Sequence, residues 1–138
     1  MNKTKTGSCL CGAVGYEIRG APLAMYYCHC EQCRKACGSS FATNLAVAEK
    51  DFHLVRGAEK LKSFASSPGK KRHFCGGCGS PVFNEMESLP GKVYVRAGTV
   101  DGGPEMAPGM HIYTDFKAPW FPILDGLPQR KAAEGIPF

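Results

Sequence analysis

The chain of 138 residues has no long apolar run. No segment approaches the roughly 18 consecutive apolar residues of a membrane-spanning helix, so we do not expect a membrane protein. The first residues, Met1–Ser8, also lack an apolar stretch behind their charges, so they do not have the pattern of a secretory signal peptide. These two absences predict a cytoplasmic protein.

The sequence also has little concentrated positive charge. Its formal net charge is +5 when every cysteine is counted as a neutral thiol. If seven cysteines instead bind two divalent metal ions as thiolates, the net charge falls by three, to about +2. The densest basic run, Lys70–Arg72, has only three residues, and we interpret it as a solvated strand end. A nucleic-acid partner is therefore not expected.

Long helical patterns are missing as well. The 17 Gly and 10 Pro are many for this length and predict frequent turns. Short strand-like segments lie between these turns; they are Ala13–Ile18, Phe41–Val47, Phe52–Val55, Leu61–Ala65 and Val93–Ala97. One short helix is predicted over Glu31–Cys37, with Gly38 as its C-terminal cap. After Thr99 the chain is expected to be irregular, because Gly and Pro recur there.

Cysteine, in contrast, is abundant, and seven of the eight cysteines fall into three clusters. The clusters are Cys9-Leu-Cys11, Cys28-His-Cys30-Glu-Gln-Cys33 and Cys75-Gly-Gly-Cys78. A disulfide framework is the competing interpretation. However, a bridge between cysteines one residue apart would close a small, strained ring, and no other feature indicates secretion. The spacing therefore favours metal binding.

The two pairs and the triplet predict different kinds of metal site. The pairs together supply four thiolates, a complete tetrahedral set that suits Zn²⁺, although iron and copper stay open. Glycines within and after Cys75–Cys78 are expected to provide a turn at positive φ. The triplet is one ligand short, so its fourth position is available for chemistry. Cys37, His29 or a distant histidine could instead fill that position and make both sites structural. The simpler interpretations are a small buried residue for Cys37, and for His29 a position at the surface or behind the ligands.

The only stretch with the composition of a linker is Ser66–Gly69. It is four residues long and lies between two cysteine pairs that we expect to share one metal, so we interpret it as a hairpin turn. The length of the chain is also typical of one domain. We therefore predict a single, mainly β domain over residues 1–138.

Six motifs between Gly7 and Gln129 together carry a family resemblance. They are Gly7–Val14, Cys28–Arg34, Phe74–Gly79, Ala97–Asp101, His111–Tyr113 and Ala118–Trp120. In this order they resemble the family of glutathione-dependent formaldehyde-activating enzymes and the related centromere-protein-V-like proteins. The resemblance implies an Mss4-like fold of packed antiparallel sheets with one or two short helices. It also implies two Zn²⁺, one structural and held by Cys9, Cys11, Cys75 and Cys78, the other catalytic and held by Cys28, Cys30 and Cys33.

The activity that this resemblance implies is that of a carbon–sulfur lyase acting on a thiol adduct such as S-hydroxymethylglutathione, with glutathione as the small-molecule partner. The rival hypothesis is a non-catalytic zinc module that binds a protein or nucleic acid, because one fold can host unrelated functions. No catalytic side chain is assigned. Asp101 has no assigned role. A structural hydrogen bond explains the presence of His111 as well as an acid–base role does. Trp120 is expected in the core. Arg34 could attract a substrate carboxylate, but a surface arginine is the simpler interpretation. The sequence does not predict the oligomeric state.

Overall fold

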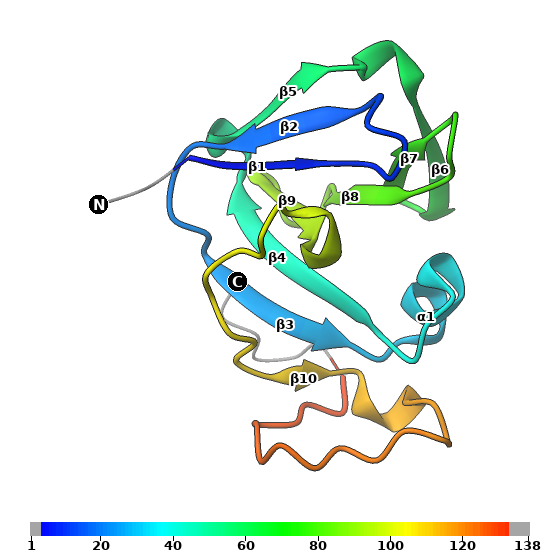
Figure 1. Cartoon of the computed structure of the whole chain (residues 1–138). Helices are drawn as coiled ribbons and strands as arrows, with labels where there is room; N and C mark the ends of the chain where they lie inside the picture. The colour runs from blue at the N-terminus through cyan, green and yellow to red at the C-terminus, as the bar shows by residue number, and fades with distance from the viewer. Residues whose placement is uncertain (1–3, 133–138) are drawn as a thin grey trace.

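The computed structural model describes residues 4–132 and is built mainly from strands, with one short α-helix in this part of the chain (Figure 1). The strands are β1 (Lys5–Ser8), β2 (Gly15–Ile18), β3 (Ala24–Cys28), β4 (Ala42–Ala48), β5 (Phe52–Arg56), β6 (Leu61–Ser67), β7 (Lys70–Cys75), β8 (Pro81–Met86), β9 (Lys92–Arg96) and β10 (His111–Ile112). The helix α1 spans Glu31–Cys37, and short 3₁₀ turns cover Glu49–Asp51, Ala58–Lys60, Ala97–Thr99 and Thr114–Phe116.

The strands form two sheets that pack against each other. The smaller sheet has the order β1-β2-β5, and the larger one has the order β10-β3-β4-β9-β8-β7-β6. Neighbouring strands are antiparallel, except that the short β10 runs parallel to β3. The predicted mainly β fold of packed sheets is thereby confirmed, with β10 as its one parallel strand among the described residues.

The main hydrophobic core lies between the two sheets. Tyr16 and Ile18 of β2 contact a layer of aliphatic side chains from the larger sheet, which includes Leu45 and Val47 of β4. Alternate residues of a strand point to opposite faces of its sheet, so Ala46 of β4 belongs to a second cluster on the other face. The larger sheet is therefore covered on both faces. Burying each large aliphatic side chain contributes about 1.5–3 kcal/mol.

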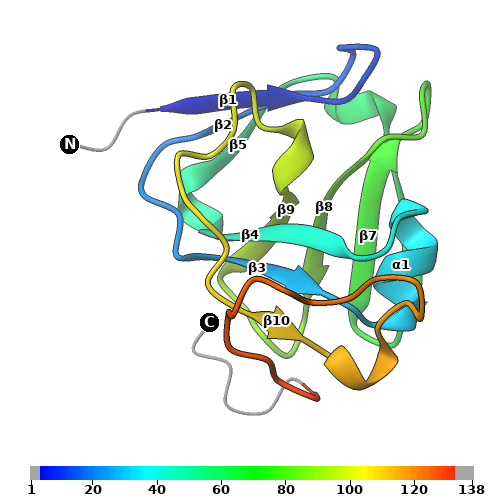
Figure 2. The same cartoon turned by 60° about the horizontal axis from the view of Figure 1, so that its bottom comes forward.

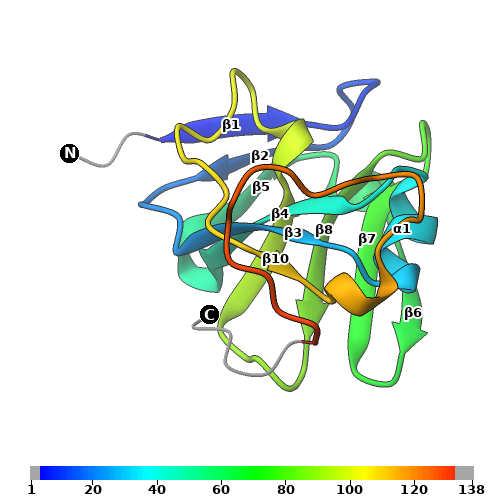
Figure 3. The ribbon, with the colours of Figure 1, turned by 90° about the horizontal axis from the view of Figure 1, so that it is seen from below.

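The second face of the larger sheet is covered by α1 and by the C-terminal part of the chain. After β10, residues 113–132 turn back across β3 and pass close to α1 (Figures 2 and 3). Two hydrogen bonds attach this segment to the helix region: Arg34 Nη1 donates to the carbonyl oxygen of Phe116 at 2.8 Å, and Trp120 Nε1 donates to Ser40 Oγ at 2.8 Å. The irregular structure predicted after Thr99 is confirmed within the described residues, apart from β10 and the 3₁₀ turn Thr114–Phe116.

The helix α1 begins and ends where the sequence predicts. The sulfur of Cys30 acts as the N-terminal cap, because it accepts a hydrogen bond from the backbone N–H of Cys33 at 3.2 Å. Gly38 adopts φ 64°, and its N–H donates to the carbonyl oxygen of Arg34. A left-handed residue after the last turn is the usual way to end a helix, and glycine adopts it without steric cost.

The five predicted strand segments correspond to β2, β4, β5, β6 and β9, and the predicted hairpin at Ser66–Gly69 joins β6 to β7. The sequence does not predict strands β1, β3, β8 and β10. Of β7 it indicates only the basic run Lys70–Arg72, interpreted above as a solvated strand end. That interpretation is wrong for Arg72, which is only 7% exposed. Its pairing with β6 and β8 places it in the interior of the larger sheet.

Candidate metal centres

The four cysteines of the two pairs meet at one point in the structure. Their sulfur atoms all lie within 4.8 Å of one another. The Sγ atoms of Cys9 and Cys11 are 3.6 Å apart, and those of Cys11 and Cys75 are 3.8 Å apart. Four sulfurs placed tetrahedrally at 2.3 Å from a zinc ion would be separated by about 3.8 Å. The arrangement of this four-cysteine site therefore fits a closed tetrahedral metal centre.

Backbone N–H groups around the four-cysteine site favour thiolates. Val14 N donates to Cys9 Sγ at 3.3 Å, and Gly77 N donates to Cys75 Sγ at 3.3 Å. Such hydrogen bonds spread the negative charge of the sulfurs. The Ser80 hydroxyl, 3.2 Å from Cys78 Sγ, is the main reason why the pKa of Cys78 falls to about 5. The site thus contains groups that stabilise deprotonated sulfur.

The glycines of the third cluster have a different role from the one predicted. Gly79, just after the second cysteine, has φ 79°, but Gly76 and Gly77 do not have positive φ. Gly76 instead allows a close approach between chain segments, because a Cβ atom there would lie 2.9 Å from the carbonyl oxygen of Lys60. Only Gly79 therefore meets the expectation of a turn at positive φ.

The four-cysteine site joins the two sheets. Cys9 and Cys11 lie in the loop that follows β1 of the smaller sheet, whereas Cys75 is the last residue of β7 in the larger sheet. Cys9 and Cys75 are also members of the main hydrophobic core. A metal bound here would cross-link two sheets that otherwise meet mainly through apolar contacts.

The triplet forms a second, separate group at one end of α1. Cys28 ends β3, Cys30 caps α1, and Cys33 lies one turn into the helix, with all three sulfurs within 4.8 Å of one another. Cys28 and Cys33 are buried, whereas Cys30 is partly exposed. The group therefore has one side directed toward solvent.

Arg72 approaches the triplet from β7. Its Nη2 atom lies 3.7 Å from Cys33 Sγ. The side chains of Cys28 and Cys30 lower the pKa of the Cys33 thiol, and Lys70 and Arg72 lower it further. In contrast, hydrogen bonding to the neighbouring cysteine sulfurs, together with burial, raises the pKa of Cys28. Cys33 is thus the member of the triplet that most readily carries negative charge.

Cys37 does not belong to the triplet. Its thiol donates to the carbonyl oxygen of Phe41 at 3.4 Å. No further Cys, His, Asp or Glu from residues 4–132 joins the group of three sulfurs. Cys37 is half-buried and packs beside the second cluster. This position agrees better with the simpler interpretation, a small residue packed in the fold, than with a metal ligand.

His29 lies between two triplet cysteines and begins a chain of buried hydrogen bonds. Its Nε2 atom is 2.8 Å from Nδ1 of His111, and His111 Nε2 is 2.9 Å from the carboxylate of Asp125. Both histidines are buried. Of the two positions expected for His29, the one at the surface is therefore excluded, and the structural hydrogen bonding considered for His111 is observed. Burial lowers the pKa of His29 to about 4, so this imidazole is neutral near pH 7. Asp125 thus fixes His111, which in turn orients the imidazole of His29.

A pocket opens beside the triplet. It has a volume of about 400 Å³ and is lined by Cys30, Glu31, Gln32, Ser67, Lys70, Met86, Tyr113 and Phe116. Tyr113 has φ 56°, a left-handed conformation that is uncommon for a residue other than glycine. Such strained residues occur most often at functional sites. The pocket places solvent-accessible space next to Cys30 and is the candidate substrate site.

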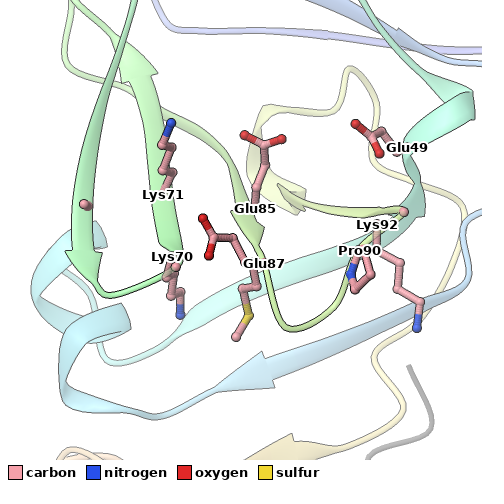
Figure 4. Close-up of a pocket in the computed structure, with 11 residues that line it drawn as sticks. Glu49, Lys70, Lys71, Glu85, Glu87, Pro90 and Lys92 are labelled. Carbon is pink, nitrogen blue, oxygen red and sulfur yellow. The ribbon is translucent and has the colours of Figure 1, made fainter.

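A second surface pocket has a different character. It has a volume of about 340 Å³ and contains no cysteine. Figure 4 shows its charged side chains; they are Glu49, Glu85 and Glu87 together with Lys70, Lys71 and Lys92. Three acidic and three basic groups balance, as is typical of a solvated surface. We therefore place the candidate chemistry at the triplet.

Three other residues singled out in the sequence can now be placed. Trp120 is 66% exposed, so its expected core position is wrong. Arg34 is half-buried and bonds to the backbone of Phe116, so it is a link within the fold. Asp101 accepts a hydrogen bond from Thr6 at 2.8 Å and connects β1 to the loop after β9. None of the three lines the pocket beside the triplet.

Comparison with known proteins identifies the family. The family model for "Glutathione-dependent formaldehyde-activating enzyme" matches residues 4–116. The chain belongs to this family. A curated relative from Halomonas elongata, named "Putative glutathione-dependent formaldehyde-activating enzyme", is 32% identical over 126 residues, which cover 85% of this chain and 79% of the relative.

A solved structure is similar to this family member as well. The crystal structure of a Rhodobacter sphaeroides protein matches with a TM-score of 0.61 and 29% sequence identity. The match covers 70% of this chain and 88% of the other. No helix within residues 4–132 is long and apolar enough to cross a membrane.

Proposed function

We propose that this family member is a zinc-dependent enzyme of the carbon–sulfur lyase type, acting on a thiol adduct such as S-hydroxymethylglutathione. The observation that carries the proposal is the triplet itself: three clustered sulfurs, no fourth protein ligand from residues 4–132, and an adjoining pocket. We assign a structural zinc to Cys9, Cys11, Cys75 and Cys78, and a catalytic zinc to the triplet. The thiolate clusters also favour a reducing compartment such as the cytoplasm.

The donor set of the triplet fits this assignment. Thiolates are soft ligands that suit zinc, and a catalytic zinc site has three protein ligands and one exchangeable position. Zinc in the triplet would supply a Lewis acid whose exchangeable position accepts the sulfur of a thiol. Three thiolates and one dication carry a net charge of −1, which is less suited to acidifying water than to binding and releasing sulfur. The nearby guanidinium of Arg72 offsets this negative charge.

The residues around the triplet provide orientation and a binding surface. The pocket volume of about 400 Å³ lies within the usual range for small-molecule sites. Lys70 and Glu31 give it one cation and one anion, which complement a zwitterionic peptide thiol. His29, which lies between Cys28 and Cys30 in the chain, is held by its contact with His111 and by a backbone hydrogen bond to Ile112 at 3.0 Å. These contacts fix the segment that carries Cys28 and Cys30.

In the proposed reaction, the bond between the thiol sulfur and the formaldehyde carbon breaks. The electron pair of this bond stays with sulfur, the hydroxyl oxygen becomes the carbonyl oxygen, and the hydroxyl proton leaves. The products are a thiol, once sulfur takes up a proton, and formaldehyde, and the reverse direction forms the adduct. No oxidant or reductant is needed.

The test measures how fast glutathione, formaldehyde and their adduct interconvert, by NMR exchange spectroscopy at equilibrium. Wild-type protein with two zinc ions should increase the exchange rate above the spontaneous rate. Cys30→Ser should lose this increase, whereas the matched control Cys37→Ser should keep it, since Cys37 lies outside the triplet. A wild-type protein with full zinc that leaves the rate unchanged would contradict the proposal and favour the non-catalytic zinc module.

A further inference from the structure

A row of polar side chains crosses the interior of the larger sheet on the face that α1 covers. Arg72 of β7 is opposite Asn84 of β8, which is opposite Tyr94 of β9. Arg96, two residues after Tyr94, is opposite Asn44 of β4. All five residues are buried, with Arg72 only 7% and Arg96 only 6% exposed. A sheet interior normally excludes charge, so two buried guanidinium groups require an explanation.

The two arginines differ in how their charge is compensated. Neither forms an ion pair with a carboxylate among residues 4–132. Arg72 has a partner in Cys33 Sγ, whose thiolate belongs to a centre of net negative charge when metal is bound. Among the described residues, the only side-chain partner of Arg96 is the neutral Asn44, to which Nη1 donates at 2.6 Å. One buried positive charge is therefore without a counter-charge, which is unfavourable unless an anion binds there.

The unpaired atoms of Arg96 indicate what kind of anion fits. Its Nε and Nη2 atoms are both buried and have no hydrogen-bond partner within residues 4–132. These two atoms lie along one edge of the planar guanidinium, and a carboxylate binds such an edge through two parallel N–H···O bonds. Arg72 Nη1 is a third buried donor without a partner. The free donors thus match a planar anion with two oxygens.

The residues that carry these donors line one pocket. Arg72, Arg96 and Asn84 line it, along with Ala36 of α1 and Phe64 of β6. Its volume of about 180 Å³ is several times the roughly 30 Å³ of one water molecule. Phe64 is opposite Arg72 in the sheet and is 64% exposed, which gives the pocket an apolar rim. The space accommodates a charged group together with the carbon chain that carries it.

We propose that this pocket, which we call the arginine pocket, binds a carboxylate group through the free edge of Arg96, with Arg72 and Asn84 beside it. Arg72 contacts both the arginine pocket and Cys33, so the carboxylate site adjoins the triplet. The ligand is either a free small carboxylate or a carboxylate of a peptide thiol. We favour the thiol, and this second assignment rests on the proposed function, whereas the carboxylate site does not.

The first experiment tests the site without using the reaction. The zinc-loaded protein is titrated with acetate and with acetamide, its neutral analogue, at constant ionic strength, and binding is measured by calorimetry and by thermal unfolding. Acetate should bind saturably and raise the melting temperature, whereas acetamide should not. Arg96→Met should weaken acetate binding about tenfold to 100-fold, because it removes the charge and both free donors. The control Arg19→Met, at an exposed arginine outside the arginine pocket, should bind like wild type.

Two results would overturn the carboxylate site: equal effects of acetate and acetamide on the wild type, or unchanged acetate binding by Arg96→Met. The replacement should not unfold the protein, since removing an uncompensated buried charge in favour of an apolar side chain of similar length is often neutral or stabilising. If Arg96→Met is nevertheless unstable, Arg96→Lys keeps the charge but lacks the two-donor edge. Arg96→Lys should therefore also bind acetate more weakly than wild type. If it binds acetate with wild-type affinity, the two-donor edge of Arg96 does not hold the carboxylate.

The second experiment separates the two sources of the carboxylate. Glutathione and its diethyl ester, which has the same thiol but no free carboxylate, are compared for binding to the wild type and to Arg96→Met. The thiol assignment predicts weaker binding of the ester to wild type and equal binding of both compounds to the variant. If acetate binds but the ester binds wild type as tightly as glutathione does, the arginine pocket takes a free carboxylate and the thiol assignment is wrong. Failure of the exchange assay alone would leave the acetate result standing.

Discussion

The two cysteine sites should respond very differently to the loss of one sulfur. Cys75 is fully buried and belongs to the site that joins the two sheets. Structural zinc contributes about 10–16 kcal/mol to folding in small zinc peptides. Losing even a third of that, roughly 3–5 kcal/mol, is comparable with the whole unfolding free energy of a marginal domain, about 5–15 kcal/mol. Cys75→Ser should therefore unfold or fail to accumulate.

Cys30 provides the contrasting case. It is partly exposed, and the triplet links only β3 and α1, on one face of a single sheet. We expect Cys30→Ser to stay folded with about half the zinc of wild type, and to lose about 1–2 kcal/mol, or roughly 4–8 °C in melting temperature. Zinc per chain is measured by mass spectrometry of the metal, and folding by circular dichroism during heating. The control Cys37→Ser should keep both zinc ions.

Two outcomes would refute this division. If Cys75→Ser and Cys30→Ser collapse to the same extent, the triplet is structural too. If Cys75→Ser instead accumulates as a folded protein with wild-type zinc content, the four-cysteine site is not the metal centre that holds the sheets together.

Three further predictions test the fold by urea unfolding. Gly57→Ala should cost about 2–5 kcal/mol, because Gly57 has φ 73° and a Cβ there would lie 1.9 Å from the Ala13 carbonyl oxygen; a cost below about 1 kcal/mol would contradict the clash. Burial raises the pKa of Tyr16 to about 12. The contribution of the neutral phenol to the free energy of unfolding is therefore complete below pH 10.0, and about 3 kcal/mol is lost as the pH rises toward 12. Tyr16→Phe should lack that loss, and an identical alkaline decline in both proteins would refute it. Trp120→Ala should cost only about 0.5–1.5 kcal/mol, since the exposed ring loses little more than its hydrogen bond to Ser40; a loss above about 3 kcal/mol would mean that the side chain packs as core.

The features that the sequence predicts well depend on local spacing. Cysteine spacing identifies both groups of sulfurs that could hold a metal ion, and the helix with its glycine cap follows from short-range turn chemistry. The features that it misses depend on long-range pairing. Arg72 lies in a basic run that has the composition of a surface strand, and only its place between β6 and β8 buries it. Arg96 lies within the predicted strand Val93–Ala97, but its burial depends on the cover that α1 and the neighbouring strands provide.

The C-terminal segment shows the same limit. Its Gly and Pro content predicts irregular structure correctly, but not its path across β3 and past α1. That path buries His111 against His29 and leaves Trp120 at the surface, the reverse of what the apolar character of tryptophan suggests. The sequence does contain a signal for the position of His29. Because His29 lies between Cys28 and Cys30, the chain itself holds it close to the triplet.

The most direct test of the account is zinc X-ray absorption on the protein loaded with two zinc ions. One site with four sulfurs and one with three predict an average of three and a half sulfur ligands per zinc, with the remaining ligand a lighter atom. Addition of glutathione should raise the average to four, because its sulfur enters the exchangeable position at the triplet. Four sulfurs per zinc before any thiol is added, or an average that glutathione does not change, would contradict the claim that one site is closed and the other open.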